Sequence, residues 1–386
     1  MKEIIIPKVD TNNYKKILVI IRWPLGGIRT YMRYTFSCFP KNYNLTLIAS
    51  STRENYALER DVKEYGAKLL ISKKKGIKGL AYEVFTELRT SRYDVILSQG
   101  FISSLAVYLP NLLFRIPHIL TIHGILEPRF IEGRFRFVKR LFLKKILSDI
   151  TILYGVSEDI LNHLYEQFPF LAKDRDKAVV IPNGIKLNEF EIPLEKPCLI
   201  RRQLGISDTT FLFGFFGRYM KQKGFDLLID AIDVLQKKEN IGSFAVLAVG
   251  SGDYLNHYQK TIKDRNLKEY FFFLPFLPQV KDVYFEVNTI IMPSRWEAAP
   301  LQPIEALMIG VPIIVSDCIG LRETVRNTPA QVFESENLIS MVDVMIDSIS
   351  KDKIKEYQAY IPIAKQRFDV KISTNKLVQI IENLYR

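Results

Sequence analysis

Cysteine and long apolar runs are scarce in this sequence of 386 residues. The three cysteines, Cys38, Cys198 and Cys318, are too few for a disulfide framework and do not have metal-ligand spacing. No segment approaches the ~18 apolar residues of a membrane-spanning helix, and Pro7 and Lys8 interrupt the start before a signal-peptide core could form. We therefore expect a cytoplasmic protein from a reducing compartment.

Several catalytic signatures are also missing. The sequence contains no Walker-type phosphate loop, no His-Glu-x-x-His helix and no Gly-x-Ser-x-Gly elbow. The segment from Gly250 to Gly252 lacks the third glycine of the dinucleotide fingerprint. These absences predict that the protein holds neither a metal ion nor a nicotinamide or flavin cofactor.

Acidic side chains are under-represented in one half of the chain only. The net charge is +12, and residues 1–186 carry 30 basic and 17 acidic side chains, whereas residues 187–386 carry 24 and 25. A strongly basic half favours an anionic partner such as nucleic acid, acidic lipid or a phosphorylated ligand. Charge alone does not choose among these three.

What is present fits two globular domains, because 48% of the residues are hydrophobic, 25% are charged and the length suits two units. Apolar runs of strand length alternate with segments of helical spacing, and the series begins again in the second half. This pattern predicts two doubly wound α/β domains with parallel sheets. The expected strands are residues 17–21, 45–49, 67–71, 94–98, 118–122, 150–154, 211–216, 244–249, 270–274, 289–292 and 311–315.

Two carboxylates follow the expected strand at 289–292. Glu297 lies just beyond its carboxyl end, where open α/β sheets bind ligands, and Glu305 lies eight residues later in a helical segment. Both side chains could bind hydroxyl groups of one ligand. They could equally be a capping glutamate and part of a solvated helix face.

Two cations flank the loop that follows the expected strand at 211–216. Arg218 comes directly after Gly217, and Lys223 precedes the next helix. A planar guanidinium and a compact ammonium group suit a diphosphate. Taken alone, two cations beside a turn are more often surface charge.

Glycines and one histidine follow other expected strands. Gly26 with Gly27, and Gly250 with Gly252, allow backbone amides to approach a phosphate, although such pairs are also ordinary strand-to-helix turns. His123 follows the expected strand at 118–122 and is either a crevice residue or a turn histidine with a satisfied side chain.

The order and spacing of these segments resemble those of the GT-B glycosyltransferases, and among them the retaining enzymes of glycosyltransferase family 4. The resemblance covers most of the chain. The shared segments are Gly26-Gly27, His123-Gly124, Gly155-Val-Ser157, Ile181-Pro-Asn-Gly-Ile185, Gly217-Arg218, Lys223-Gly224, Gly250-Ser-Gly252, Pro293-Ser294, Glu297 with Glu305, Gly310-Val-Pro312 and Gly320-Leu-Arg-Glu323.

The resemblance implies transfer of a sugar from a nucleoside diphosphate sugar with retention at the anomeric carbon and without a metal ion. In that scheme Arg218 and Lys223 clamp the diphosphate, Glu297 contacts the donor sugar, Glu305 binds the ribose, and His123 reaches across the cleft towards the anomeric centre. The catalytic set is His123, Arg218, Lys223 and Glu297. The donor-binding set is Gly26, Gly27, Gly217, Gly250, Gly252, Pro275, Leu301 and Glu305.

Three positions depart from the family pattern. Pro275 replaces a glycine that family members often have near the nucleobase, Asn288 replaces an aspartate, and Ala298 replaces glycine or proline. The resemblance also implies an acceptor-binding domain at 1–185, a donor-binding domain at 186–368 that faces it across a cleft, and a last helix at 369–386 that crosses back to the first domain.

A basic and aromatic segment at 129–147 follows the histidine turn. As a helix it places Phe135, Val138, Leu141 and Phe142 on one stripe with arginines and lysines around it. Helices on anionic lipid have this pattern, and so do core-packed helices with a solvated outer face. The first reading fits a peripheral protein on the inner face of the cell membrane that glycosylates a glycan or lipid-linked acceptor.

Other functions remain open at this stage. A nucleotide-sugar epimerase or a non-catalytic nucleotide-sugar binder would use the same donor residues. A nucleic-acid-binding protein would use the basic face, but it would leave Arg218, Lys223, Glu297 and Glu305 without a role.

Overall fold

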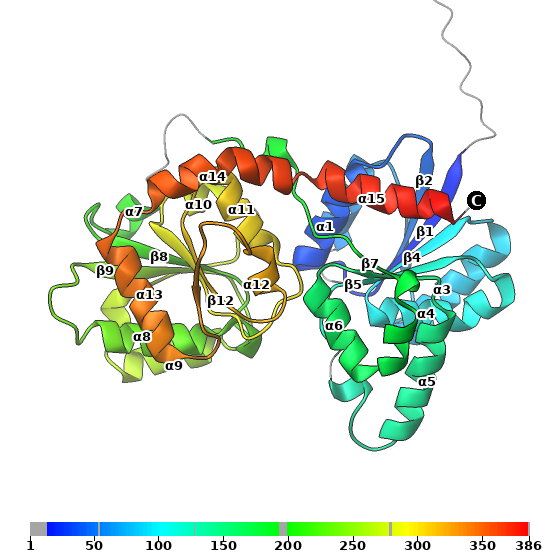
Figure 1. The fold of residues 1–386 in the computed structure, drawn as a ribbon, viewed down its shortest axis with the longest axis horizontal. Coiled ribbons are helices and arrows are strands. Elements are labelled where there is room, and N and C mark those ends of the chain that lie inside the picture. Colours follow the sequence, from blue (N-terminus) through cyan, green and yellow to red (C-terminus); the bar gives the residue numbers. More distant parts are fainter. Residues whose placement is uncertain (1–13, 53–54, 127, 193–198, 278–279, 385–386) are drawn as a thin grey trace, which may run out of the picture. The chain divides into compact units, whose positions relative to one another are not determined.

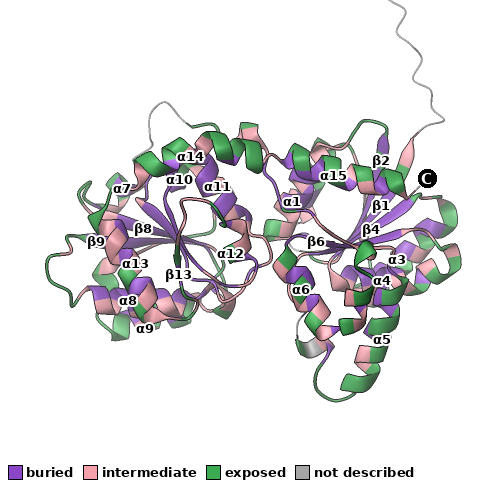
Figure 2. Cartoon of the chain, viewed as in Figure 1, coloured by how far each residue is buried: buried purple, intermediate pink, exposed green. Residues whose placement is uncertain are grey.

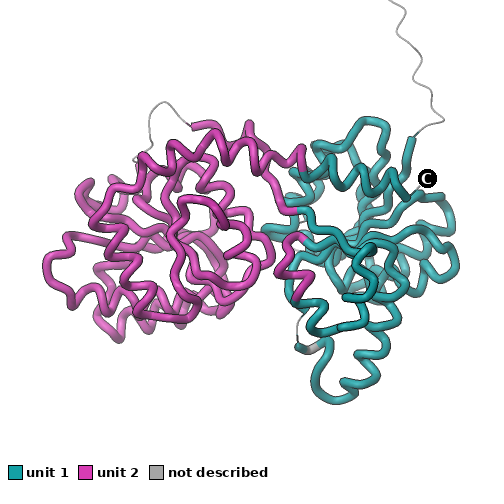
Figure 3. The backbone as a smooth tube through the Cα atoms, in the orientation of Figure 1, with its two compact units in different colours: residues 1–155, 163–181, 373–386 teal, residues 156–162, 182–372 magenta. Residues whose placement is uncertain are grey.

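The computed structural model describes residues 14–52, 55–126, 128–192, 199–277 and 280–384. The first residues of the chain and Cys198, which entered the sequence analysis, lie outside these ranges. Two compact units are present, shown in two colours in Figure 3. Unit 1 comprises the described residues of 1–155, 163–181 and 373–386, and unit 2 comprises those of 156–162 and 182–372.

Unit 1 contains a parallel sheet of seven strands in the order β3-β2-β1-β4-β5-β6-β7 (Figure 1). Its central strands are buried along their length, as expected for a sheet that is covered by helices on both faces (Figure 2). The strands are β1 (Lys15–Ile21), β2 (Tyr43–Ser50), β3 (Lys68–Ser72), β4 (Val95–Gln99), β5 (His118–Ile122), β6 (Ile152–Gly155) and β7 (Ala178–Val180). The helices are α1 (Gly26–Ser37), α2 (Asn55–Glu64), α3 (Gly76–Thr90), α4 (Phe101–Phe114), α5 (Arg136–Asp149), the second half of α6 (Glu158–Gln167) and most of α15 (Val370–Asn383).

Unit 2 contains a second parallel sheet, of six strands in the order β10-β9-β8-β11-β12-β13. The strands are β8 (Phe211–Phe216), β9 (Phe244–Val249), β10 (Phe271–Leu274), β11 (Thr289–Met292), β12 (Ile313–Ser316) and β13 (Gln331–Phe333). The helices are α7 (Leu199–Leu204), α8 (Phe225–Leu235), α9 (Leu255–Asp264), α10 (Lys281–Tyr284), α11 (Leu301–Ile309), α12 (Leu321–Thr324), α13 (Leu338–Ser350) and α14 (Ile354–Arg367). The predicted fold class, two doubly wound Rossmann-like domains, is confirmed.

The core of unit 2 is rich in aromatic side chains. Phe213, Tyr219 and Phe225 are almost completely buried, and the Phe215 and Phe225 rings meet edge to face with centroids 4.7 Å apart. Such rings bury a large apolar area and prefer this geometry. Because β8 and its following loop supply most of these rings, the core fixes the carboxyl end of β8.

Helix α6 begins in unit 2, although the sequence analysis placed this whole segment in the first domain. The Glu323 carboxylate accepts hydrogen bonds from the backbone N–H groups of Glu158 and Asp159, both at 3.0 Å. The Asp159 carboxylate in turn accepts two hydrogen bonds from the Arg322 guanidinium, at 2.8 and 2.9 Å. A carboxylate at a helix N-terminus is favourable, so these contacts attach the first turn of α6 to unit 2.

The C-terminal helix α15 packs on unit 1 from Ser373 onward. Thr374 is buried and its hydroxyl donates to the backbone oxygen of Thr35 in α1 at 3.3 Å. Glu382 accepts a hydrogen bond from the Tyr43 hydroxyl at 3.2 Å. The last helix therefore crosses back to the N-terminal unit, as the sequence resemblance implies.

Within unit 2, the segment at Ile185 pairs with the segment at Asp369, which lies just before the chain returns to unit 1. The N–H groups of Ile185 and Val370 donate to the backbone oxygens of Phe368 and Ile185. A side-chain carbon on Gly184 would lie 2.6 Å from the Val370 Cα, so only glycine fits there. No helix in the described part of the chain is long and apolar enough to span a membrane.

Candidate active site

Lys223 and Glu297 form an ion pair at the carboxyl edge of the unit 2 sheet. Lys223 lies at the end of the loop after β8, and Glu297 lies in the loop after the neighbouring strand β11. The Lys223 ammonium donates to Glu297 Oε1 at 2.5 Å, and the Ser294 hydroxyl donates to the same oxygen at 2.8 Å. The Glu297 side chain is only 9% exposed. Two predicted site residues that are 74 positions apart in the sequence therefore meet in the fold.

The loop that carries Glu297 is held on both sides. The Arg295 N–H donates to the Gln222 backbone oxygen, and the Gln222 side-chain amide donates to the Trp296 oxygen at 2.9 Å. The Arg295 guanidinium makes two hydrogen bonds, of 2.7 and 3.0 Å, to the Asp226 carboxylate of α8. The sequence analysis missed Ser294, Gln222, Arg295 and Asp226 in these roles, although all four flank the motifs that it used.

Glycine is required where the loops after β8 and β9 touch. A side-chain carbon on Gly250 would lie 1.9 Å from the Gly217 backbone oxygen, and one on Gly252 would lie 2.5 Å from the Tyr219 oxygen. Gly224 has φ +65°, and a side-chain carbon there would meet the Pro293 oxygen at 1.8 Å. The backbones around Arg218 and Lys223 therefore pack more closely than any larger residue would permit.

Arg218 is exposed directly after Gly217. Among the residues that the structure describes, its guanidinium has no hydrogen-bond or ion-pair partner. An unpaired guanidinium at the carboxyl edge of a parallel sheet is available to an anionic ligand. Arg218 and Lys223 thus lie at the same sheet edge, but of the two only Lys223 forms an ion pair in the described part of the chain, with Glu297.

Glu305 lies in the second turn of α11, and its Oε2 accepts a hydrogen bond from the Tyr284 hydroxyl at 3.0 Å. The Tyr284 ring packs edge to face on Phe216, the last residue of β8, with centroids 4.7 Å apart. These contacts place Glu305 beside the same sheet edge as Glu297. Leu301 is buried at the first position of α11, and Pro275 is exposed just after β10.

In unit 1, His123 follows β5 at the carboxyl edge of the seven-stranded sheet. Its Nε2 lies 2.7 Å from Gln99 Oε1, and its ring meets the edge of the Tyr31 ring at 4.7 Å. Burial lowers the pKa of His123 from 6.5 to about 3, so the imidazole is neutral at physiological pH. Because an amide oxygen can only accept a hydrogen bond, the contact with Gln99 Oε1 places the ring proton on Nε2 and leaves the lone pair on Nδ1.

Gly26 and Gly27 begin helix α1 at the same edge of the unit 1 sheet. Both are exposed, and a side-chain carbon on either would meet no other atom within 4 Å. Gly26 has φ +56°, a conformation that favours glycine. The space beside this turn is open among the described residues.

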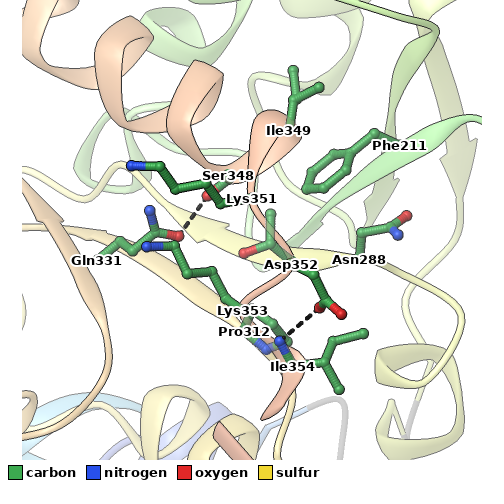
Figure 4. A pocket seen from close by; sticks show the side chains of 11 residues that line it. Phe211, Asn288, Pro312, Gln331, Ser348, Ile349, Lys351, Asp352, Lys353 and Ile354 are labelled. Carbon is green, nitrogen blue, oxygen red and sulfur yellow. Dashed lines mark hydrogen bonds between the residues drawn. The ribbon is translucent and has the colours of Figure 1, made fainter. Parts of the chain in front are cut away.

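A cavity of about 260 Å³ lies at the opposite edge of the unit 2 sheet (Figure 4). It is lined by residues at the starts of strands, such as Phe211, Thr289 and Gln331, and by the Lys351–Ile354 segment between α13 and α14. None of the predicted site residues lines it. The cavity is therefore separate from the site at the carboxyl edge.

Two family models match adjoining parts of the chain. The model described as Glycosyltransferase Family 4 matches residues 25–189, and the model described as Glycosyl transferases group 1 matches residues 199–367. Together they span most of the 386 residues.

Relatives and solved structures agree with these matches. The UDP-Gal:alpha-D-GlcNAc-diphosphoundecaprenol alpha-1,3-galactosyltransferase of Escherichia coli is 24% identical over 359 residues, 89% of this chain and 90% of the relative. The O-antigen biosynthesis glycosyltransferase WclY of Escherichia coli is 24% identical over 314 residues, 76% and 80% of the two chains. Anabaena Alr3699/HepE, solved in complex with UDP and glucose, superposes with a TM-score of 0.78 at 18% identity and covers 96% of this chain and 100% of its own.

The two adjoining family matches correspond to the two Rossmann-like units, and the E. coli galactosyltransferase aligns with 89% of this chain. The resemblance predicted from the sequence motifs is confirmed: this protein belongs to the GT-B glycosyltransferases, with a Glycosyltransferase Family 4 unit followed by a Glycosyl transferases group 1 unit.

Proposed function

We propose that this protein is a retaining, metal-independent glycosyltransferase that moves a sugar from a nucleoside diphosphate sugar to a glycan or lipid-linked acceptor in polysaccharide assembly. One observation supports the donor side most strongly. Arg218, Lys223 and Glu297 lie at one sheet edge of unit 2, on loops whose close packing depends on Gly224, Gly250 and Gly252. The E. coli and Anabaena proteins named above supply the class of donor and acceptor by analogy.

The two cations would stabilise the leaving diphosphate. Negative charge builds on the β-phosphate as the bond to the sugar breaks, and preorganised cations in a partly dry site lower the energy of that state. Arg218 supplies a planar pair of donors and Lys223 a point charge. In this scheme they take the part that a divalent metal takes in other transferases.

The ion pair between Lys223 and Glu297 would open when the donor binds. Lys223 would turn to the diphosphate, and Glu297, still held by the Ser294 hydroxyl, would accept hydrogen bonds from the donor sugar. Each charge therefore has a partner both without and with the donor. This exchange limits the cost of holding a carboxylate that is only 9% exposed.

In unit 1, the neutral His123 would contribute a hydrogen bond to the donor sugar near its anomeric centre, and the Gly26-Gly27 turn would line the phosphate side. Glu305 would bind the ribose through its carboxylate. No side chain is assigned as a covalent nucleophile.

Thermal unfolding in the presence of different sugar donors tests this proposal. Nucleoside diphosphate sugars are added to the wild-type protein and to Glu305→Ala, and thermal unfolding is followed. We expect one donor class to raise the wild-type melting temperature and to act more weakly on the variant. Stabilisation of the wild type by nucleic acid, with no effect of any donor, would contradict the proposal.

Product analysis distinguishes sugar transfer from epimerisation of the nucleotide sugar and from binding without reaction. Free nucleoside diphosphate should appear only when an acceptor is present, and the anomeric configuration of the product should match that of the donor. An epimerase would yield a second nucleotide sugar instead, and a silent binder would yield nothing. Activity that survives a metal chelator would support the metal-independent scheme.

We also propose that unit 1 contacts the anionic inner face of the cell membrane. The stripe of Phe135, Val138, Leu141 and Phe142 on and beside α5 is exposed rather than packed into the core, which excludes the core-packed reading of this face (Figure 2). The Tyr108 and Phe142 rings meet edge to face with centroids 5.9 Å apart, so α4 contacts α5 at this stripe. Helix α4 also carries the exposed Leu109, Leu112 and Leu113 near its end. Basic residues such as Arg136 and Lys144 surround it.

Vesicle co-sedimentation tests the membrane contact. The wild-type protein should sediment with vesicles that contain phosphatidylglycerol, and less so with pure phosphatidylcholine. Val138→Glu with Leu141→Glu should abolish sedimentation, whereas Ile339→Glu, at an exposed site on α13 of unit 2, should not. Equal sedimentation of all three proteins would contradict the proposal.

A further inference from the structure

Trp23 is an exposed tryptophan on a fixed backbone. It follows β1 at the carboxyl edge of the unit 1 sheet, and its side chain is 51% exposed. The Arg22 N–H donates to the Ser103 hydroxyl at 3.0 Å, and the Leu25 N–H donates to the Trp23 oxygen at 2.9 Å. These bonds hold the turn in place while the indole ring remains accessible.

One face of the indole ring is already covered. The Arg22 guanidinium carbon lies 5.1 Å from the ring centroid, in a cation–π arrangement. This contact orients the ring, and the 51% exposure of Trp23 leaves part of the ring surface accessible to a ligand. Tryptophan in such a setting offers a large, rigid apolar surface with a polar N–H at its rim.

The position of Trp23 distinguishes it from other exposed side chains, since single exposed hydrophobic residues are common. Trp23 lies on the turn into α1, which begins at Gly26, and Tyr31 of the same helix touches the His123 ring at 4.7 Å. Helix geometry puts Tyr31 only ~8 Å along the axis from Gly26. Trp23 therefore lies at the same carboxyl edge of the unit 1 sheet as His123, the unit 1 residue proposed to meet the reacting sugar.

A pyranose ring matches this surface chemically. One of its faces presents C–H groups, which pack on an aromatic ring, and its rim presents hydroxyls, which accept hydrogen bonds from a guanidinium. We propose that Trp23 forms an acceptor-sugar subsite, in which the indole face opposite Arg22 stacks on a pyranose of the acceptor. This inference rests on the proposed glycosyltransferase function and names a residue that sets its acceptor affinity.

Steady-state kinetics test the subsite with the full-length protein. The acceptor probe is N-acetylglucosamine linked through a diphosphate to an undecyl chain, chosen because the E. coli relative is named for such an acceptor. Trp23→Ala should raise the acceptor KM about tenfold with kcat and donor KM nearly unchanged, and Trp23→Phe should restore most of the affinity. The control is Tyr82→Ala, since Tyr82 is 53% exposed and lies under Lys74 at 4.4 Å.

Fluorescence gives a readout that does not need turnover. The chain has two tryptophans, so Trp296→Phe leaves Trp23 as the only one. Titration of this variant with the acceptor probe should change the Trp23 emission and saturate, whereas undecyl diphosphate without the sugar should not cause that change.

The outcomes separate the inference from the proposed function. An unchanged acceptor KM in Trp23→Ala, or a flat titration beside an active wild type, overturns the subsite while the transferase function stands. A fall in melting temperature and in donor affinity together would mean that Trp23 is only structural, which also overturns it. If no donor supports transfer by the wild type, the proposed function fails, and the fluorescence titration alone decides whether Trp23 binds the sugar.

Discussion

At the scale of single residues, the pairing of Lys223 with Glu297 links the stability of the donor site to its chemistry. Lys223→Met should lower turnover roughly 100- to 1,000-fold, because a cation that stabilises the leaving group is lost. It should also lower the free energy of unfolding by about 1–3 kcal/mol, because the nearly buried Glu297 carboxylate loses its charged partner. Initial rates and urea unfolding measure the two effects.

Lys221→Met provides the matched control for Lys223→Met. Lys221 lies in the same short helical turn, but its side chain is exposed. We expect wild-type stability and nearly wild-type turnover for this variant. Equal losses in the two variants would show that the loop needs positive charge in general and not the specific contact with Glu297.

A second residue-scale prediction concerns pH. His118 is 4% exposed, its Nε2 lies 2.8 Å from the Ser98 hydroxyl, and burial lowers its pKa from 6.5 to about 3. Between pH 6.5 and 3, His118 is therefore protonated in the unfolded chain but remains neutral in the native chain. Since stability falls wherever the unfolded state binds more protons, the free energy of unfolding should decrease as the pH falls through this window.

His118→Gln isolates this contribution, because glutamine does not titrate and can still reach the Ser98 hydroxyl. Urea unfolding of both proteins between pH 7.5 and 4.5 should give a shallower slope for the variant. Carboxylates titrate in both proteins and cancel in the comparison. Parallel pH profiles would mean that His118 is protonated in the native state.

At the scale of elements, the connections after β8 and β9 form one packed unit. Gly250→Ala would place a carbon 1.9 Å from the Gly217 oxygen and force the two loops apart. We expect a loss of about 1–3 kcal/mol in stability and a clear loss of donor affinity, since the backbone next to Arg218 must shift. Urea unfolding and donor-induced thermal shift measure these changes.

Gly27→Ala is the control for Gly250→Ala. A side-chain carbon on Gly27 would meet no atom within 4 Å, so its effect on the free energy of unfolding should stay within about 0.5 kcal/mol. A destabilisation as large as that of Gly250→Ala would show that glycine matters at these turns through backbone freedom and not through close approach.

At the scale of the whole molecule, residues at the end of the chain complete the core of its first unit. Ile381 in α15 is completely buried, whereas Ile372 in the same helix is 43% exposed. Ile381→Ala should lower the free energy of unfolding by about 2–5 kcal/mol, because it leaves a cavity in unit 1. Ile372→Ala should have a much smaller effect, and chemical denaturation compares the two. A similar loss in both would mean that α15 contributes helix propensity rather than packing.

The charge imbalance also belongs to this scale. The basic excess lies in residues 1–186, which include α5 and its exposed stripe, whereas residues 187–386 are nearly neutral and carry Arg218, Lys223 and the two glutamates. The excess positive charge therefore lies in the unit that is proposed to bind the acceptor and the membrane. The proposed donor site would need only Arg218 and Lys223, its two local cations.

The sequence by itself determined the two sheets and most of their strands. The runs at 118–122, 211–216, 244–249 and 289–292 have the observed bounds, because a parallel strand that is buried on both faces is a continuous apolar run. The edge strands β7 and β13, of three residues each, were missed because so short a segment carries no periodicity of its own. The residues predicted for the donor site were chosen from their order and spacing along the chain, and the structure brings two of them, Lys223 and Glu297, into contact.

Only the tertiary structure decided how those residues are held. The 2.5 Å contact from Lys223 to Glu297 spans 74 positions, and the contacts of Asp159 and Glu323 that attach α6 to unit 2 span more than 160. The exposure of the α5 stripe and of Trp23 likewise depends on which other elements pack against them. Local sequence fixes which backbone conformation each segment prefers, but which distant side chains share a low-dielectric pocket depends on the packing of the complete chain.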